Sequence, residues 1–219
     1  MNEQMPVRPA NPVQTGRPTR ETAQRRQEEL LERALEMFSQ SGFELTTIDA
    51  IASSLNMTKR TIYARYKDKA ALFEAAVKRA IDRWFIPIET LRTADTGDLE
   101  TTLVAIARLR VANNLSPEGL RLQRIVTSEA FRFPEVYHAY EVVANTVIQF
   151  LVEVFEKYRA AQPGEWFEDS ELAASTFLSI VNTPARRALL FGRTLPPETM
   201  DPFIAKAVHL FMTGLLPRQ

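Results

Sequence analysis

The chain of 219 residues contains no cysteine and only two histidines, His138 and His209. Without thiols it can form no disulfide, no thiolate zinc site and no cysteine nucleophile. It also has no glycine-rich phosphate-binding loop and no grouping of histidines with carboxylates of the kind that hydrolases or metal sites use. These absences argue against an enzyme, and we expect no metal and no other cofactor.

Long apolar runs are missing as well. No stretch approaches the ~18 residues that a membrane-spanning helix needs, and the first residues lack the charged-then-apolar pattern of a signal peptide. We therefore expect a cytoplasmic protein with no membrane partner. Its 45% hydrophobic and 25% charged residues are typical of a globular chain with a sizeable core, and its length predicts one or two domains.

The charge of the chain is balanced overall but unevenly distributed. Lys and Arg together number 27, as do Asp and Glu. Residues 57–72, "MTKRTIYARYKDKAAL", nevertheless contain five basic residues and two tyrosines. Only a local role can explain such a cluster, because the net charge of the whole chain indicates nothing about nucleic acid or membranes.

The sequence around this cluster predicts a series of helices. Apolar residues at helical spacing indicate a first helix from Thr22 to Gly42, where glycine can take a left-handed cap conformation. Thr46 and Asp49 fit a capping box that starts a second helix ending near Leu55. Asn56 suits the tight turn that follows. A third helix, with Thr58 as its cap, is expected over 59–66, and Asp68 caps a fourth.

Two short helices joined by so tight a turn predict a helix-turn-helix. The cations and hydroxyls of the third helix would project outward, with a shape and charge that the major groove of DNA accepts. The alternative is that the cations form a solvated face. We favour DNA binding because the caps, the turn and the charge agree.

The segment "LLERALEMFSQSGFELTTIDAIASSLNMTKRTIYARYKDKAALFEAAV", residues 30–77, resembles the DNA-binding domain of the TetR family of bacterial transcriptional regulators. The resemblance departs from the family pattern at Asn56 and at Arg60, where the family commonly has glycine or a small residue. It implies phosphate contacts from Thr47, Tyr63 and Lys69. It implies base contacts from Lys59, Arg60, Thr61 and Arg65.

The first residues are expected to form a flexible arm over 1–21, because they combine several prolines with few apolar side chains. Within it, Gly16-Arg17-Pro18 makes Arg17 a candidate for a minor-groove contact. A disordered solubilising tail is the alternative. The predicted domains after the arm are the helix-turn-helix domain, 22–67, and a connecting helix with the C-terminal domain, 68–219.

Beyond residue 88 the pattern is helical, with helices expected over 99–115, 117–131, 134–160, 168–192 and 202–213. Thr183-Pro184 should kink the fourth of these, and Asp201-Pro202 should open the last. We therefore predict an all-α fold: an N-terminal three-helix DNA-binding domain and a C-terminal helical bundle. The segment "SEAFRFPEVYHAY", residues 128–140, is similar to a TetR subgroup with AefR-like regulatory domains.

The resemblance implies that the C-terminal domain forms a homodimer and binds a small-molecule effector. The candidate dimer residues lie on the last two predicted helices: Phe177, Val181, Leu189, Phe203, Leu210 and Phe211. Some of them must instead belong to the core of the monomer. The candidate pocket residues are mostly aromatic: Trp84, Phe85, Arg110, Phe131, Phe133, Tyr137 and Tyr140. Each of these side chains would equally suit an ordinary core.

The function implied is that of a repressor, released from a palindromic double-stranded DNA operator by an apolar or amphipathic effector. The alternative is a ligand-independent DNA-bound protein that recruits a protein partner through its C-terminal domain. A core without a cavity, or an exposed apolar patch away from the dimer interface, would favour this alternative.

Overall fold

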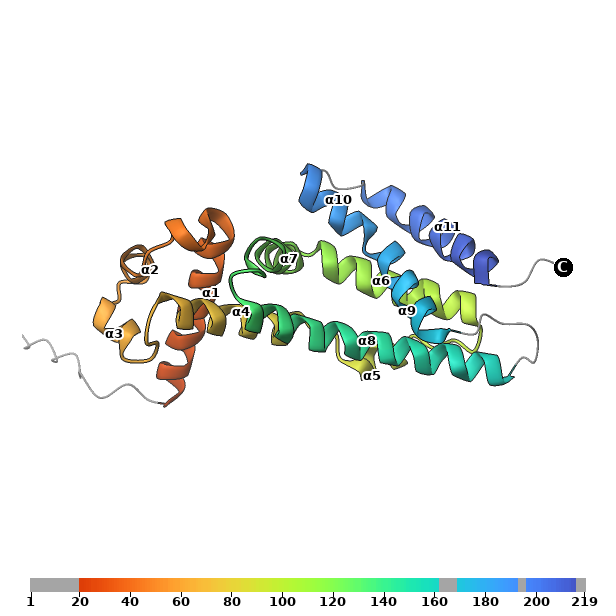
Figure 1. The fold of residues 1–219 in the computed structure, drawn as a ribbon, viewed down its shortest axis with the longest axis horizontal. Helices are drawn as coiled ribbons and strands as arrows, with labels where there is room; N and C mark the ends of the chain where they lie inside the picture. Colours follow the sequence, from red (N-terminus) through yellow and green to blue (C-terminus); the bar gives the residue numbers. More distant parts are fainter. Residues whose placement is uncertain (1–19, 162–168, 193–195, 216–219) are drawn as a thin grey trace, which may run out of the picture.

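The computed structural model describes residues 20–161, 169–192 and 196–215. Within these ranges the chain forms eleven helices and no strand, as the predicted all-α class requires. The molecule is elongated, with the first helices at one end and a bundle of the later helices at the other (Figure 1). None of the helices in these ranges is long and apolar enough to cross a membrane.

Four helices build the N-terminal end of the molecule. They are α1 (Arg20–Leu45), α2 (Ile48–Ser54), α3 (Lys59–Tyr63) and α4 (Lys69–Trp84). The backbone of α1 breaks at Gly42, where φ is 76° and ψ is 169°. The predicted break is therefore at the right residue, although this ψ lies outside the left-handed helical region. A positive φ is accessible to glycine because it has no Cβ.

Seven helices follow. They are α5 (Ile88–Arg92), α6 (Leu99–Leu115), α7 (Pro117–Glu129), α8 (Pro134–Ala161), α9 (Ser170–Val181), α10 (Thr183–Phe191) and α11 (Pro197–Leu215). The predicted starts of α6, α7 and α8 are confirmed. Asp98 caps α6 by accepting from Thr101 N, and Ser116 caps α7 by accepting from Gly119 N. Local capping chemistry therefore sets these boundaries.

The helices after α4 differ from the prediction in three ways. The single kinked helix expected over 168–192 is two helices, α9 and α10, that meet at Asn182 ahead of Pro184. The last helix begins at Pro197, so Asp201 does not cap it and Pro202 lies inside it. The Asp201 carboxylate instead accepts a hydrogen bond from Arg108 Nε at 2.9 Å. The short helix α5 had not been expected.

Two apolar cores hold the helices together. The N-terminal core joins α1–α4 to α7 and to the first turn of α8. Its centre is aromatic: the Phe73 ring meets the Phe38 ring at 5.1 Å, edge to face, and the Phe133 ring at 4.5 Å. The C-terminal core joins α5, α6, α8, α9 and α11. Because α8 contributes to both cores, it connects the two ends of the molecule physically (Figure 1).

The turn between α7 and α8 packs against the segment that precedes α2. Glu129 Oε1 accepts from Phe43 N at 3.4 Å, and Arg132 forms an ion pair with Glu44. The Phe133 ring lies 4.8 Å from the Phe43 ring. The segment that leads into α2 is thus in direct contact with the later helices, so α2 and α3 do not follow a free linker.

Candidate nucleic-acid interface

Helices α2 and α3 form a helix-turn-helix whose turn depends on local backbone chemistry. Asn56 has a φ of 51°, the positive value that the sequence predicts for this position. The turn is closed by hydrogen bonds from Met57 N to Ala52 O and from Asn56 N to Ser53 O. Ile51, Ala52 and Ile62 are buried and hold the two helices against the N-terminal core. The turn thereby fixes which face of α3 is left outside.

The start of α2 is capped by a different threonine from the one predicted. Thr47 Oγ1 accepts from Ala50 N at 3.1 Å. The Thr46 hydroxyl instead donates to Gly42 O at 2.8 Å, and its side chain is only 2% exposed. The expected capping box of Thr46 with Asp49 is therefore wrong by one residue. Two adjacent threonines offer the same hydroxyl, and only packing decides which of them turns inward.

All of the side chains predicted to read bases, three on α3 and one just after it, are exposed. Lys59, Arg60, Thr61 and Arg65 lie on the surface, and Ile62 is the buried residue among them. Lys59 Nζ is 2.6 Å from Asp49 Oδ1. The Thr61 hydroxyl is 2.9 Å from that of Thr58. The result is a short helix whose outer face carries cations and hydroxyls, which is what insertion into a major groove requires.

Tyr63 and Lys69 have surroundings that the sequence did not predict. The Tyr63 side chain is 51% exposed, which leaves it accessible beside the cations of α3. Lys69 Nζ donates to three carbonyls, those of Phe43, Glu44 and Thr46, at 2.8, 3.1 and 3.0 Å. An ammonium group has three donors. All three are thus engaged, so a phosphate could be bound only in exchange for one of these carbonyls.

Thr47 caps α2 and is also exposed, so its side chain is accessible at the start of this helix. Arg17, the candidate for a minor-groove contact, lies outside the described residues, as does most of the predicted arm. The described part of the interface therefore comprises the exposed face of α3, Arg65 two residues after this helix, and the first turn of α2.

The predicted pocket residues separate into three groups. Phe131 is fully exposed and Tyr137 is 48% exposed, so neither lines an interior site. Phe133 is buried in the N-terminal core and Phe85 packs on the C-terminal core. Trp84, Arg110 and Tyr140, in contrast, come together. Of the seven predicted pocket residues, these three are the ones that form a cluster.

The cluster is built on the indole of Trp84. The Trp84 and Tyr140 rings are stacked at 5.7 Å with 20° between their planes, and the Arg110 guanidinium lies 5.3 Å from the Trp84 ring centroid. Arg110 is 5% exposed. Burial lowers the pKa of Arg110 and raises that of Tyr140. Arginine nevertheless stays protonated in proteins, so a positive charge is buried here.

Asn114 belongs to the same region but was not predicted. It lies one helical turn after Arg110 on α6, is 2% exposed, and its Nδ2 donates to Asn182 Oδ1 at 2.5 Å. The sequence carried a usable signal, because Arg110 and Asn114 are polar residues spaced four apart on the apolar face of a helix.

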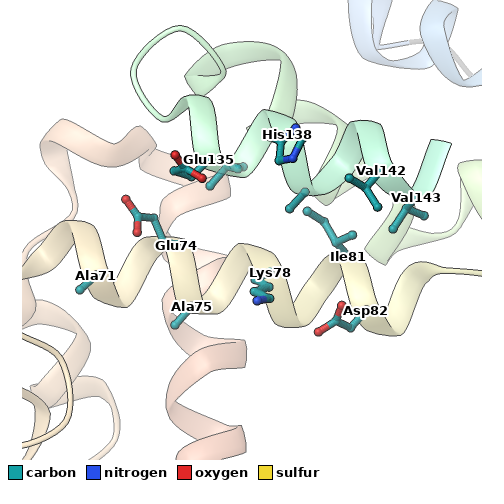
Figure 2. A pocket seen from close by; sticks show the side chains of 12 residues that line it. Ala71, Glu74, Ala75, Lys78, Ile81, Asp82, Glu135, His138, Val142 and Val143 are labelled. Carbon is teal, nitrogen blue, oxygen red and sulfur yellow. The ribbon is translucent and has the colours of Figure 1, made fainter. Parts of the chain in front are cut away.

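Two surface hollows lie beside α4. The larger, of about 700 Å³, is a groove between α4 and α8. Figure 2 shows Glu74 and Glu135 near one end of this groove and Val142 and Val143 toward the other. The second hollow, of about 570 Å³, has Trp84, Asn113 and Ser116 in its wall.

The candidate dimer residues divide between core and surface. Phe177, Val181 and Phe211 are at most 5% exposed and belong to the C-terminal core of a single chain. Leu189 and Phe203 are partly buried, whereas Leu210 is 72% exposed. Two further exposed apolar residues on α10, Leu190 and Phe191, were not among the predicted set.

Two family models match this chain in adjoining regions. One, described as "Bacterial regulatory proteins, tetR family", matches residues 30–76, which hold the helix-turn-helix. The other, described as "AefR-like transcriptional repressor, C-terminal domain", matches residues 101–214.

Individual proteins agree with these matches. The regulator IcaR of Staphylococcus aureus (strain Newman), a negative transcriptional regulator of the biofilm operon icaADBC, is 33% identical over 55 residues. These residues make up 25% of this chain and 30% of that regulator's length.

Solved structures extend the similarity to the whole fold. A TetR-family regulator from Mesorhizobium loti MAFF303099 has a TM-score of 0.73 at 22% identity, covering 89% of this chain and 98% of its own. The flavonoid-responsive regulator FrrA has a TM-score of 0.65 at 26% identity, covering 90% and 100%. Because the AefR-like match alone spans more than half of the residues, and the first match coincides with the helix-turn-helix, the chain belongs to the TetR family of non-enzymatic, DNA-binding transcriptional regulators.

Proposed function

We propose that this chain is a homodimeric repressor that binds a palindromic operator and is released from it by a small effector bound in the C-terminal half. The exposed face of α3 is the observation that carries the proposal. IcaR, which is similar to this chain over 55 residues, is a negative regulator, which supports repression. FrrA is flavonoid-responsive, which supports control by a small molecule.

The contacts with DNA follow from the positions of the side chains. Lys59, Arg60, Thr61 and Arg65 reach base edges, with Arg60 pairing to guanine through its two-pronged guanidinium. Thr47 and the Tyr63 hydroxyl contact phosphates. Lys69 is a positioning residue in this scheme, because its ammonium already holds the carbonyls that precede α2.

A dimer would place two copies of α3 in successive major grooves, about 34–36 Å apart. The exposed apolar residues of α10 and α11 suit an interface between two copies, since such residues are otherwise unfavourable in water. They are Leu190, Phe191 and Leu210, which are 65%, 66% and 72% exposed.

An effector near Trp84 would have two physical routes to α3. Trp84 ends α4, whose first residue, Lys69, holds the segment before α2. Tyr140 lies on α8, and the residue before α8, Phe133, packs against the rings of Phe43 and Phe73. A ligand that shifts α4 against α8 therefore acts at both points. It releases DNA only if it favours a state in which the two copies of α3 no longer match the groove spacing.

Selection of bound sequences from a random DNA pool, at about 0.15 M salt, tests this proposal. We expect an inverted repeat bound by one dimer or a pair of dimers. With that operator, Arg60→Ala should change the preferred base at one position, losing about 1–3 kcal/mol of discrimination. Tyr63→Phe should weaken binding to all sequences alike.

Arg124→Ala on α7 is the matched control for these variants, because Arg124 is exposed and lies outside the proposed interface. Equal losses on every sequence for Arg60→Ala and Tyr63→Phe would contradict the division between base and phosphate contacts. Binding without any enriched sequence would contradict a sequence-specific repressor.

One observation favours the alternative of a DNA-bound protein that recruits a partner. Leu45 and Phe131 are 80% and 101% exposed, and their neighbours Glu44 and Arg132 form an ion pair, so two apolar side chains are exposed close to the helix-turn-helix. If Phe131→Ser abolishes regulation in cells while operator affinity and effector response are unchanged, partner recruitment replaces ligand release as the mechanism.

A further inference from the structure

Three buried polar atoms within the described residues have no hydrogen-bond partner: Trp84 Nε1, Arg110 Nε and Asn114 Oδ1. Buried polar groups in native proteins are nearly always paired, so each exception needs an explanation. These three share one region: Arg110 lies over the Trp84 ring, and Asn114 follows Arg110 by one helical turn. Their grouping points to one missing partner.

Of these three residues, Arg110 is the one for which the lack of a partner is most unfavourable, because it carries a charge. In the part of the chain that the structure describes, Arg110 has no ion pair and no hydrogen bond. Its guanidinium lies over the Trp84 ring and interacts electrostatically with Tyr140. A buried cation is strongly unfavourable unless it is paired. Stacking on an indole offsets only part of this cost. An anion bound beside Arg110 would supply the acceptor that Nε lacks.

The surroundings of Arg110 indicate the shape of that anion. The Trp84 and Tyr140 rings stack at 5.7 Å, so a flat apolar group would find aromatic surface beside the cation. Trp84 Nε1 and Arg110 Nε are both donors, and Asn114 Oδ1 is an acceptor. A carboxylate satisfies the donors, and a hydroxyl elsewhere on the same molecule satisfies the acceptor.

Trp84 also lies in the wall of the hollow of about 570 Å³ that opens beside Asn113 and Ser116. Trp84 thus borders both a surface hollow and the buried cation. A Cβ added at Gly119 would lie 2.3 Å from Asn113 O, 2.9 Å from Asn114 O and 3.0 Å from Trp84 Nε1, so glycine there allows the close approach of α7 to the end of α6 and to the indole. Movement of the indole would connect the hollow with Arg110.

We propose that the Trp84–Arg110–Asn114 cluster binds a small aromatic carboxylate, with Arg110 as its counter-charge. The carboxylate accepts from Arg110 and from the Trp84 indole, and the ring lies against the aromatic pair. The cluster is a binding site whether or not it controls DNA. The statement that this ligand is the effector rests on the proposed function.

The test compares matched anionic and neutral probes on the full-length dimer. 4-Hydroxybenzoate and phenylacetate are titrated against 4-hydroxybenzamide and phenylacetamide, which have the same shape and no charge, by calorimetry and by thermal unfolding. We expect both carboxylates to raise the Tm of the wild type by about 2–4 °C at saturating concentration. The amides should leave it unchanged.

Arg110→Met removes the counter-charge, and Arg108→Met, two residues away on the same helix, is the control. Arg108 is exposed and paired with Asp201. The carboxylates should bind Arg110→Met at least roughly tenfold more weakly and should bind Arg108→Met as they bind the wild type. Without ligand, Arg110→Met should be at least as stable as the wild type, because an unpaired buried charge has been removed.

Several outcomes would overturn the proposal: amides that bind as well as carboxylates, no binding of either carboxylate by the wild type, or undiminished binding by Arg110→Met. The comparison of probes on the wild type stands even if Arg110→Met fails to fold. Operator binding is measured separately. Carboxylates that bind through Arg110 without weakening operator binding support the site and contradict ligand release, whereas release by neutral molecules alone contradicts the site and leaves the proposed function intact.

Discussion

At the start of α2 and of α3, one threonine hydroxyl accepts a hydrogen bond from a backbone N–H of the first turn. Thr47 accepts from Ala50 N and Thr58 from Thr61 N. Helices of seven and five residues are too short to be stable by themselves. Each cap therefore stabilises a helix and also sets the direction in which the DNA-facing side chains point.

We predict that Thr47→Ala lowers the free energy of unfolding by about 1 kcal/mol, because the N–H of Ala50 loses its acceptor. Thr47→Ser keeps the hydroxyl and should retain most of the stability. Urea unfolding of the two variants and the wild type measures the difference. An alanine variant as stable as the serine variant would show that the cap contributes nothing.

Asp95 provides a pH-dependent contribution at the residue scale. Its carboxylate accepts from Lys157, from Gly97 N at 3.1 Å and from the Tyr158 hydroxyl at 2.8 Å. The hydrogen bond from Lys157 is the largest cause that lowers the pKa of Asp95 to about 2. A folded-state pKa below the unfolded value means stabilisation that is fully present above about pH 4 and is lost as the pH falls through 2.

Asp95→Asn should therefore lower the urea midpoint at pH 6, and its difference from the wild type should shrink as the pH falls from 4 toward 2. The control is Asp82→Asn on α4, since Asp82 has no hydrogen bond or ion pair in the described ranges. A difference that stays constant down to pH 2 would contradict the role assigned to the Asp95 carboxylate.

Among the elements, the segment between the break in α1 and the start of α2 depends on a residue of another helix. Lys69, the first residue of α4, binds three carbonyls of this segment, and its ammonium also lies 4.3 Å from the centroid of the Phe43 ring. The position of α2, and with it α3, therefore depends on Lys69.

Lys69→Met should lower the free energy of unfolding by about 1–3 kcal/mol, because three carbonyls lose a charged donor. Operator binding should weaken while the slope of log K against log salt stays the same. Lys67→Met, two residues earlier and exposed, is the control. If instead the slope decreases by about 1 and stability is unchanged, Lys69 contacts a phosphate, as the family resemblance implied.

The boundaries of elements were predictable where capping chemistry is local. The cap residue Asp98 marks the start of α6, and the cap residue Ser116 followed by Pro117 marks the start of α7. At α11 the same reasoning misplaced the start, because Asp201-Pro202 looks like a cap whether or not a helix already precedes it. The helix continues through Pro202, and Asp201 pairs with Arg108 of α6 instead. That contact is between helices and has no trace in the local sequence.

For the whole molecule, the exposed apolar residues of α10 and α11 require an explanation. Family members act as dimers, and α10 and α11 lie across the bundle from α8 (Figure 1). Leu210 is 72% exposed in the single chain, so it contributes little to the monomer's own core. It can therefore be changed without loss of the fold.

We expect Leu210→Glu to raise the dissociation constant of the dimer by at least roughly a hundredfold, because each subunit would place a carboxylate in an apolar interface, near the carboxylate of the other subunit. Sedimentation velocity measures this, and operator affinity should fall in parallel. Val142→Glu on α8, at a residue 51% exposed, is the control and should remain dimeric. A fully dimeric Leu210→Glu protein would exclude this face of α11 from the interface.

The sequence by itself determined the all-α class, the helix-turn-helix, the exposed cations of α3 and the positive φ at Asn56. These follow from periodicity, caps and turn residues, which act between neighbours in the chain. Only the tertiary structure decided which hydroxyl caps α2, where Lys69 binds, and that Phe133 is buried whereas Phe131, two residues away, is fully exposed.

The same distinction applies to the candidate sites. Periodicity identifies the apolar face of a helix but not the neighbour that covers it, so Phe177 and Phe211 were predicted for a dimer interface and lie in the core of one chain. The unpaired state of Arg110 is likewise invisible in the sequence. Whether a buried arginine meets a carboxylate depends on contacts between α4, α6 and α8, which are far apart in the chain and adjacent only after folding.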